Sequence, residues 1–151
     1  DPDYKNAAGV AQFLTGTPPI LSLAVLDSAL DIFTDITITD INRKANALAE
    51  LFLDLVTNDK DLHCLALESK ADSALRGTQL AFSHADAYAI SRALNKARVV
   101  VDFRSPDIIR FGFSPLFLRF EDIWRATQII KEIVKEKTYL ADEFSQKLKV
   151  T

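Results

Sequence analysis

The spacing of apolar and polar positions predicts helices and strands in an order typical of an α+β domain. The clearest helix is predicted from Thr39 to about Val56, because its apolar residues recur at intervals near 3.6. These residues are Ile41, Ala45, Leu48, Ala49, Phe52, Leu55 and Val56. Another helix is predicted from Asp86 to Lys96. A long last helix has acids in its first turn, which favour the positive end of the helix dipole. Its inner face is predicted to hold Ile123, Trp124, Thr127 and Ile130.

An earlier helix is predicted to start in the tetrad Gly16-Thr17-Pro18-Pro19 and to run to about Ile36. Thr17 is a good N-cap residue, and proline is favoured at the first helical position. The segment before the tetrad is expected to be an extended lead-in. Because the apolar residues of this helix cover more than one stripe, we expect it to be buried on most sides.

Four strands are predicted between and after these helices. The run from residue 79 to 84 alternates in polarity, as a half-buried strand does, and Val99 begins a β-branched run typical of a buried strand. A turn at Pro106 and Asp107 joins the last two strands. The strand segments are 62–67, 79–84, 99–101 and 108–113. The order of elements predicts an α+β layer, with the helices packed on one face of a small sheet.

Composition and charge exclude several classes of function. Eighteen basic and 21 acidic residues give a net charge of −3, which lacks the basic footprint of a nucleic-acid binder. No apolar run reaches the roughly 20 residues that span a bilayer. The single cysteine, Cys64, suits a reducing compartment and predicts a cytoplasmic protein. The chain has no methionine and begins at Asp1, so we expect it to be a piece of a longer protein.

The usual chemical side chains give no catalytic or metal-binding pattern. His63, Cys64 and His84 lack the second Cys/His pair that a metal site needs, and we expect them to be structural. Neither a nucleophile elbow nor a glycine-rich phosphate loop is present. Lys5 lies in a polar lead-in without an apolar pocket to depress its pKa, so it is not a candidate Schiff-base lysine. Trp124 and the ten phenylalanines are most simply core residues.

Arg110 is the most informative charged residue. It lies between Ile109 and Phe111 inside an apolar strand, so its side chain either extends to the surface or is held there for an anion. Its planar fork matches a carboxylate. Arg104 is expected to make a structural ion pair or to cap the turn. The hydroxyl of Thr17, at a helix start, is a second candidate anion contact, with a plain N-cap as the alternative.

Four blocks of the sequence resemble the kynureninase family. They are residues 1–4 (DPDY), 16–23 (GTPPILSL), 76–80 (RGTQL) and 102–116 (DFRSPDIIRFGFSPL), and they occur in the family's order across nearly the whole chain. The chain departs from the family at Arg98 and Val99, where relatives commonly carry a Gly-Val pair, so that turn is expected to differ locally.

The resemblance implies a pyridoxal-phosphate (PLP) enzyme of the aspartate aminotransferase fold type, of which this chain is the small C-terminal α+β domain. Such enzymes hydrolyse L-kynurenine, or its 3-hydroxy form, to anthranilate, or 3-hydroxyanthranilate, and L-alanine. By resemblance, Arg110 grips the substrate α-carboxylate and Thr17 contacts the cofactor phosphate across a homodimer interface. The Schiff-base lysine and the other cofactor contacts would belong to a missing large PLP domain, so the chain alone is expected to be inactive, with no catalytic residue of its own.

In this interpretation residues 1–19 form a lead-in and linker from the large domain, and residues 20–151 form the small domain. Two alternatives remain open at this point. The chain could be a free-standing regulatory or ligand-binding domain in which Arg110 binds a small carboxylate. It could also be an interaction module that docks through the helix expected between Thr17 and Ile36.

Overall fold

The computed structural model describes residues 5–146 and divides the chain into two compact units, one up to Thr37 and one from Ile38 onward. We call these the N-terminal unit and the C-terminal unit. The predicted linker, residues 1–19, lies within the N-terminal unit, and its residues 1–4 fall outside the described residues.

The N-terminal unit contains one α-helix, α1 (Ile20–Leu30), between two 3-10 turns, η1 (Gly9–Phe13) and η2 (Asp31–Phe33). The expected extended lead-in is therefore partly wrong, because η1 lies within it. The predicted helix start is also wrong: the N-cap is Pro19, and Thr17 lies two residues before it. Pro19 disfavours a helical conformation at Pro18, so the helix can begin only after the second proline.

The sheet of the C-terminal unit has four antiparallel strands in the order β1-β2-β4-β3. The strands are β1 (Ala66–Leu67), β2 (Leu80–Ser83), β3 (Asp102–Arg104) and β4 (Ile108–Phe111). In register, Ala81 and Asp102 both lie opposite Arg110, and Phe82 and Phe103 both lie opposite Ile109. Because side chains alternate between faces along a strand, these two rows belong to opposite faces of the sheet.

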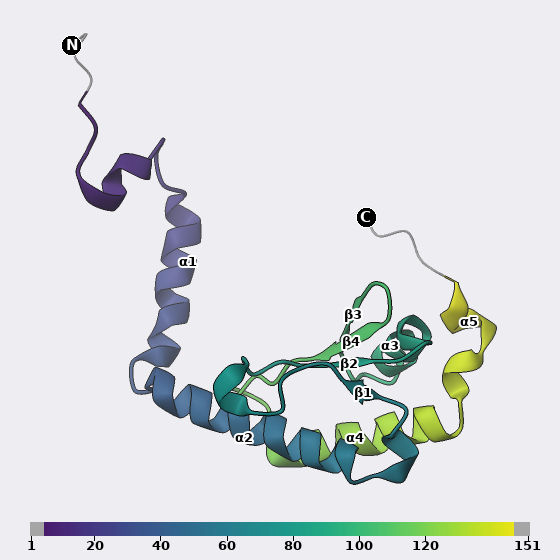
Figure 1. The fold of residues 1–151 in the computed structure, drawn as a ribbon. Coiled ribbons are helices and arrows are strands. Elements are labelled where there is room, and N and C mark those ends of the chain that lie inside the picture. Colours follow the sequence, from purple (N-terminus) through teal and green to yellow (C-terminus); the bar gives the residue numbers. More distant parts are fainter. Residues whose placement is uncertain (1–4, 147–151) are drawn as a thin grey trace. The chain divides into compact units, whose positions relative to one another are not determined.

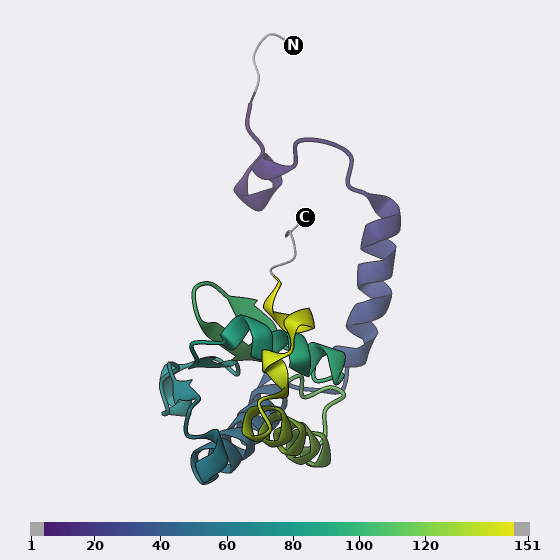
Figure 2. The same cartoon turned by 90° about the vertical axis from the view of Figure 1, so that its right-hand side faces the viewer.

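The row that contains Ile109 faces the hydrophobic core and the helices. Helices α2 (Ile38–Thr57), α3 (Ala87–Lys96) and α4 (Phe120–Lys135) cover this face, and α2 and α4 lie side by side beneath the sheet in Figures 1 and 2. Phe52 of α2 contacts the rings of Phe82 and Phe111, with centroids 6.0 and 4.8 Å away. Tyr88 of α3 packs edge-on against Phe103 at 5.3 Å. The structure thus confirms a small α+β domain with helices on one face of its sheet.

The long last helix begins where its acidic first turn predicts. The Asp122 carboxylate accepts a hydrogen bond from the Arg119 backbone N–H (2.8 Å) and pairs with the Arg119 guanidinium (3.0 Å). The hydrogen bonds from Arg119 lower the pKa of Asp122 below its ordinary value. Ile123, Thr127 and Ile130 are buried as predicted, whereas Trp124 is 53% exposed and lies outside the core. After this helix come η5 (Thr138–Leu140) and α5 (Asp142–Ser145), where Tyr139 and Phe144 close the core.

The predicted strand at Val99–Val101 is wrong, because these residues form the connection between the end of α3 and the start of β3. The Val99 N–H donates to the Leu94 carbonyl (2.9 Å), and Arg98 adopts a left-handed backbone with φ 66°, the arrangement that commonly closes a helix. The Asn95 side chain then bonds both the N–H and the carbonyl of Val101, each at 3.1 Å. Val100 is 86% exposed, and the strand starts only at Asp102.

Two further expectations also differ from the structure. The strand predicted from Leu62 to Leu67 is only two residues long, because the Asp59 carboxylate accepts the Asp61 N–H (3.0 Å) and caps a 3-10 turn, η3 (Lys60–Leu62). Several phenylalanines expected in the core are exposed. These are Phe13, Phe33, Phe117 and Phe120. Phe13, Phe33 and Phe117 lie outside the three core helices, and Phe120 is the first residue of α4, on its exposed side.

Candidate functional site

Arg110 lies on the face of the sheet opposite the core. It is in the middle of β4, between β2 and β3, and its neighbours across the strands are Ala81 and Asp102. Ile109 and Phe111 on either side of it are buried, while the Arg110 side chain keeps 29% of its surface exposed. The strand therefore fixes the backbone of Arg110 and leaves part of its side chain exposed to solvent.

The guanidinium of Arg110 is paired with one carboxylate oxygen of Asp102. Its Nε donates to Asp102 Oδ2 at 2.8 Å, and its Nη2 donates to the same oxygen. Arg104 Nε lies 3.1 Å from that oxygen as well, which confirms the structural ion pair expected for Arg104. Two cations and one anion leave this cluster with one net positive charge.

The contacts of Arg110 determine which part of it can bind a ligand. The structure gives Nη1 no hydrogen bond to any of residues 5–146. A guanidinium presents two pairs of N–H groups, and a planar carboxylate can match either pair with two parallel bonds. Asp102 uses the Nε/Nη2 pair, so the Nη1/Nη2 pair is the one that a small carboxylate can reach. The arrangement suits binding and orientation of an acid.

Thr17 lies in the N-terminal unit, in the segment that leads into α1. It is exposed, and the structure gives its hydroxyl no partner among the described residues. The first intrahelical bond of α1 runs from the Leu23 N–H to the Pro19 carbonyl (3.0 Å), so the amides of Ile20, Leu21 and Ser22 precede the hydrogen-bonded ladder. A hydroxyl and free amides near a helix start are donors that phosphate groups bind.

The two histidines and the cysteine are not brought together. His63 Nε2 contacts the Thr57 carbonyl (3.1 Å), and His84 Nδ1 accepts the Asp86 N–H (2.9 Å), so each ring has a local structural contact. Burial raises the pKa of the Cys64 thiol, which disfavours the reactive thiolate. Within residues 5–146, no group of three or more His, Cys, Asp or Glu side chains could hold a metal ion. Lys5 is exposed.

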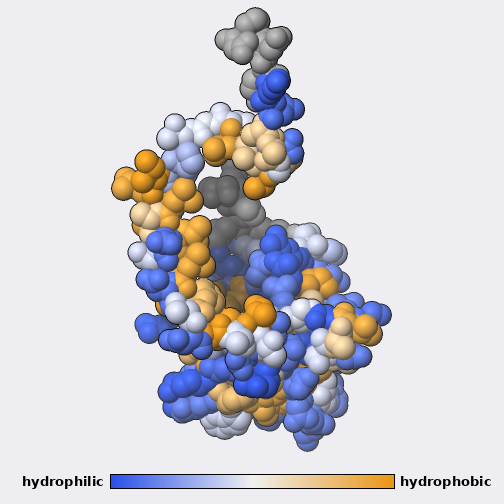
Figure 3. Space-filling model, turned by 90° about the vertical axis from the view of Figure 1, so that its left-hand side faces the viewer, coloured by the Kyte–Doolittle hydropathy of each residue, from blue (hydrophilic) through white to orange (hydrophobic). Residues whose placement is uncertain are grey.

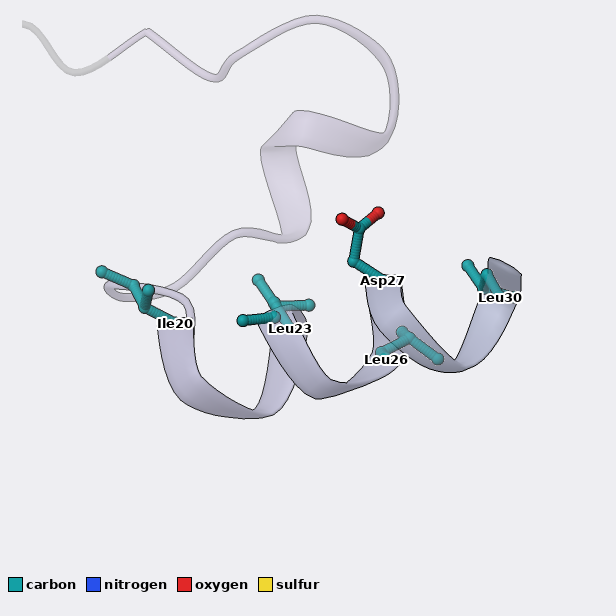
Figure 4. A pocket seen from close by; sticks show the side chains of 6 residues that line it. Ile20, Leu23, Leu26, Asp27 and Leu30 are labelled. Carbon is teal, nitrogen blue, oxygen red and sulfur yellow. The ribbon is translucent and has the colours of Figure 1, made fainter. Parts of the chain in front are cut away.

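The apolar side chains of α1 are exposed, contrary to the burial expected from its composition. No residue of this helix, all of which the structure describes, is buried, and Leu21 is 84% exposed. Figure 3 shows hydrophobic side chains gathered along the helix. A shallow hollow on its surface is lined by residues of this helix alone, as Figure 4 shows. Its lining residues are Ile20, Leu23, Ala24, Leu26, Asp27 and Leu30.

Sequence reasoning missed an apolar cavity in the C-terminal unit. It has a volume of about 690 Å³ and lies between the segment after α3, the end of β4 and the first turns of α4. Val100 and Phe117 line it and are 86% and 73% exposed. The β-branched run at Val99–Val101 predicts a buried strand, so the sequence pattern gives no signal for this cavity.

The fold and the site define a small α+β domain that has helices on one face of its sheet and a partly exposed arginine on the other. Comparison with known proteins narrows this class. A family model described as the kynureninase C-terminal domain matches residues 41–130. The chain therefore belongs to the kynureninase family.

Curated relatives match along the whole chain. The chain is 38% identical over 151 residues to the kynureninase of Pseudomonas fluorescens. The aligned region is 100% of this chain and 36% of that protein. The chain is 35% identical over 150 residues to the kynureninases of Burkholderia mallei (strain SAVP1) and Burkholderia pseudomallei (strain K96243), covering 99% of this chain and 36% of each relative. The chain thus spans little more than a third of the length of these relatives.

Within residues 5–146, none of the helices combines the length and apolar character that crossing a membrane requires.

Proposed function

We propose that this chain is the C-terminal portion of a kynureninase that hydrolyses L-kynurenine, or 3-hydroxykynurenine, to anthranilate, or 3-hydroxyanthranilate, and L-alanine. The observation that carries the proposal is the 35–38% identity to kynureninases, which extends along nearly the whole chain. The portion alone is expected to be inactive, because the resemblance assigns the Schiff-base lysine to the large domain and Lys5, the lysine before the Thr17 segment, is exposed.

In this proposal Arg110 binds the α-carboxylate of the substrate. The Nη1/Nη2 pair of its guanidinium matches a carboxylate with two parallel hydrogen bonds. Strand β4, which is paired on both sides, fixes the backbone from which the Arg110 side chain extends. Fixing one end of the substrate limits the orientations of the bond to be cleaved, and such positioning can lower a barrier by several kcal/mol. Arg110 therefore orients the amino-acid end of the substrate and takes no part in proton transfer.

The residues of the N-terminal unit fit a role in holding the phosphate of PLP. The exposed Thr17 hydroxyl and the amides at the start of α1 are neutral donors that suit a phosphate dianion. When bound, PLP would supply the electron sink for the bond cleavage. Thr17 would only bind and orient the cofactor, and the remaining contacts would come from a large PLP-binding domain of the same chain.

The partners proposed for the chain follow from the same family membership. They are the large PLP-binding domain, a second copy in a homodimer, and the small-molecule substrate. A cytoplasmic location stays a prediction, and it agrees with the free thiol of Cys64, the chain's one cysteine.

The test is kinetic and uses the complete gene product that contains this chain, loaded with PLP. Replacing Arg110 by Lys keeps the charge and removes the planar fork, so kcat/KM for L-kynurenine should fall by about 10- to 100-fold. The release of anthranilate, followed by its fluorescence, gives the rate. The absorption spectrum of the bound cofactor should not change.

Arg125→Lys is the matched control, because Arg125 pairs with Glu121 on the exposed side of α4. It should keep wild-type kinetics. Equal kinetics for Arg110→Lys and wild type would remove Arg110 from the proposed role. A wild-type protein that binds PLP and leaves kynurenine unchanged would contradict the proposed activity and favour a carboxylate-binding domain of another kind.

A further inference from the structure

Asp102 is placed to control the geometry of Arg110. It lies on the outermost strand, β3, directly opposite Arg110 in the antiparallel register, so both side chains emerge on the same face of the sheet. The Asp102 side chain is 47% exposed and that of Arg110 is 29% exposed. The pair is thus close to the surface, where a small molecule can reach it, and is held by two hydrogen-bonded strands.

The contact between them is one-sided. Both donors of Arg110, Nε and Nη2, converge on Oδ2 of Asp102. The N–H of Nε and one N–H of Nη2 point along one edge of the planar guanidinium, and the second N–H of Nη2 and one N–H of Nη1 point along the next edge. Asp102 therefore fixes the plane and the rotation of the guanidinium, and it leaves the second edge to a ligand. A bound carboxylate does not need to displace it.

Arg104 completes the arrangement from the same strand. It is two residues from Asp102, on the same face, and its Nε lies 3.1 Å from Asp102 Oδ2. The Arg104 side chain is 62% exposed, so its own attraction is largely screened by water. Its effect is to keep a second positive charge beside Asp102, so that the cluster stays net positive and attracts an anion although it contains a carboxylate.

We infer that Asp102 is a positioning residue that holds Arg110 by its Nε/Nη2 edge, so that the Nη1/Nη2 edge receives the carboxylate of an amino-acid substrate. This inference rests on the proposed function and assigns a residue beyond it. Asp102 does not touch the substrate. Its contribution is to reduce the number of guanidinium orientations that must be frozen when the carboxylate binds, which is a gain in binding affinity through preorganisation.

The experiment compares Asp102→Asn with wild type in the complete, PLP-loaded gene product. Asparagine has the same shape but loses the charge that holds two donors on one oxygen. We expect the KM for L-kynurenine and the inhibition constant of L-alanine both to rise about tenfold, while kcat falls by no more than about threefold. Asp102→Glu, which keeps the charge, should recover part of the affinity for L-alanine.

Glu143→Gln is the matched control. Glu143 pairs with Lys96 at 2.7 Å, and both side chains are more than half exposed, so the variant removes an ion pair elsewhere on the same unit. It should leave KM, kcat and L-alanine inhibition unchanged. Urea unfolding of each variant separates a folding defect from a binding defect. If Asp102→Asn does not fold, Asp102→Ser, which also removes the carboxylate, provides the same comparison.

Three outcomes would overturn the inference. Unchanged KM and L-alanine inhibition would show that Asp102 does not position Arg110. Tighter L-alanine binding would show that Asp102 competes with the ligand. A lower kcat and lower stability at unchanged KM would show a structural role only.

The proposed function is judged separately, by whether wild type hydrolyses kynurenine at all. If it does not, calorimetric titration of L-alanine decides the inference alone. A Kd that rises about tenfold in Asp102→Asn supports it, and an unchanged Kd, or no binding to wild type, overturns it.

Discussion

Helices α1 and α2 are both rich in apolar residues, yet they contribute to the molecule in different ways. Leu48, Ala49 and Phe52 of α2 are at most 2% exposed and form the core of the C-terminal unit. In α1, Leu21 and Val25 are 84% and 71% exposed. The apolar residues of α2 lie on one stripe with polar residues behind it, whereas those of α1 surround the helix. One stripe is enough to form a core with a sheet, but a helix that is apolar all round needs partners on several sides.

The largest expected effect tests whether α2 carries the stability of its unit. Phe52→Ala removes a ring that contacts Phe82, Phe111 and Phe113, and it leaves a cavity in the core. The free energy of unfolding should fall by about 3–5 kcal/mol, measured by urea denaturation of the chain.

Leu21→Ala in α1 is the control for this comparison, because it also truncates an apolar side chain of a helix. Its effect should stay within about 0.5 kcal/mol, since an exposed side chain leaves no cavity. A loss comparable to that of Phe52→Ala would mean that α1 is buried in the folded chain and would break the comparison.

A smaller effect of opposite sign is expected at the end of α3. Arg98 has φ 66°, a left-handed backbone that costs a residue with a Cβ about 1–2 kcal/mol and costs glycine little. Arg98→Gly should therefore raise the free energy of unfolding by about 1 kcal/mol in the same assay. A destabilised variant would show that the Arg98 side chain makes a contribution larger than the backbone cost.

The smallest effect is a dependence of stability on pH. Lys131 on α4 hydrogen-bonds Asp59 and, with the Asp61 N–H, lowers the pKa of Asp59 below its ordinary value of 3.8. A lowered folded-state pKa gives stability that is present above the unfolded pKa and is lost as the pH falls through the folded one. Asp59→Asn should therefore flatten the loss of stability below about pH 4. Urea midpoints from pH 6 to pH 3 measure it, and parallel curves for variant and wild type would contradict it.

The sequence predicted the helices well wherever one stripe of apolar residues was separated from polar ones. The predicted range 39–56 agrees closely with α2, and the predicted 86–96 agrees with α3. The strands were harder, because β3 consists of Asp102, Phe103 and Arg104, and the β-branched run before it looked more like a strand. The strand starts later because the Asn95 side chain bonds the Val101 backbone and the Val99 N–H bonds the Leu94 carbonyl. Residue propensities do not contain these specific hydrogen bonds.

The candidate site was only half visible in the sequence. Arg110 could be singled out because a charge inside an apolar strand needs a reason. Its partner Asp102 was missed, although a signal existed: Asp102 and Arg110 lie at equal distances from Pro106 in the predicted turn, so a tight hairpin places them opposite each other. Thr17 stays a predicted phosphate contact, chosen from its residue type. The helix cap expected there belongs to Pro19, because two adjacent prolines shift the start of α1.

The position of β3 at the end of the strand order has a consequence for aggregation. An outermost strand offers unpaired backbone groups to any other chain, and short length and charged side chains are the usual protection against this. β3 has three residues, and two of them, Asp102 and Arg104, are charged and bound to each other. The Asp102 carboxylate that is proposed to hold Arg110 therefore also helps, together with Arg104, to discourage the strand of another molecule from extending the sheet.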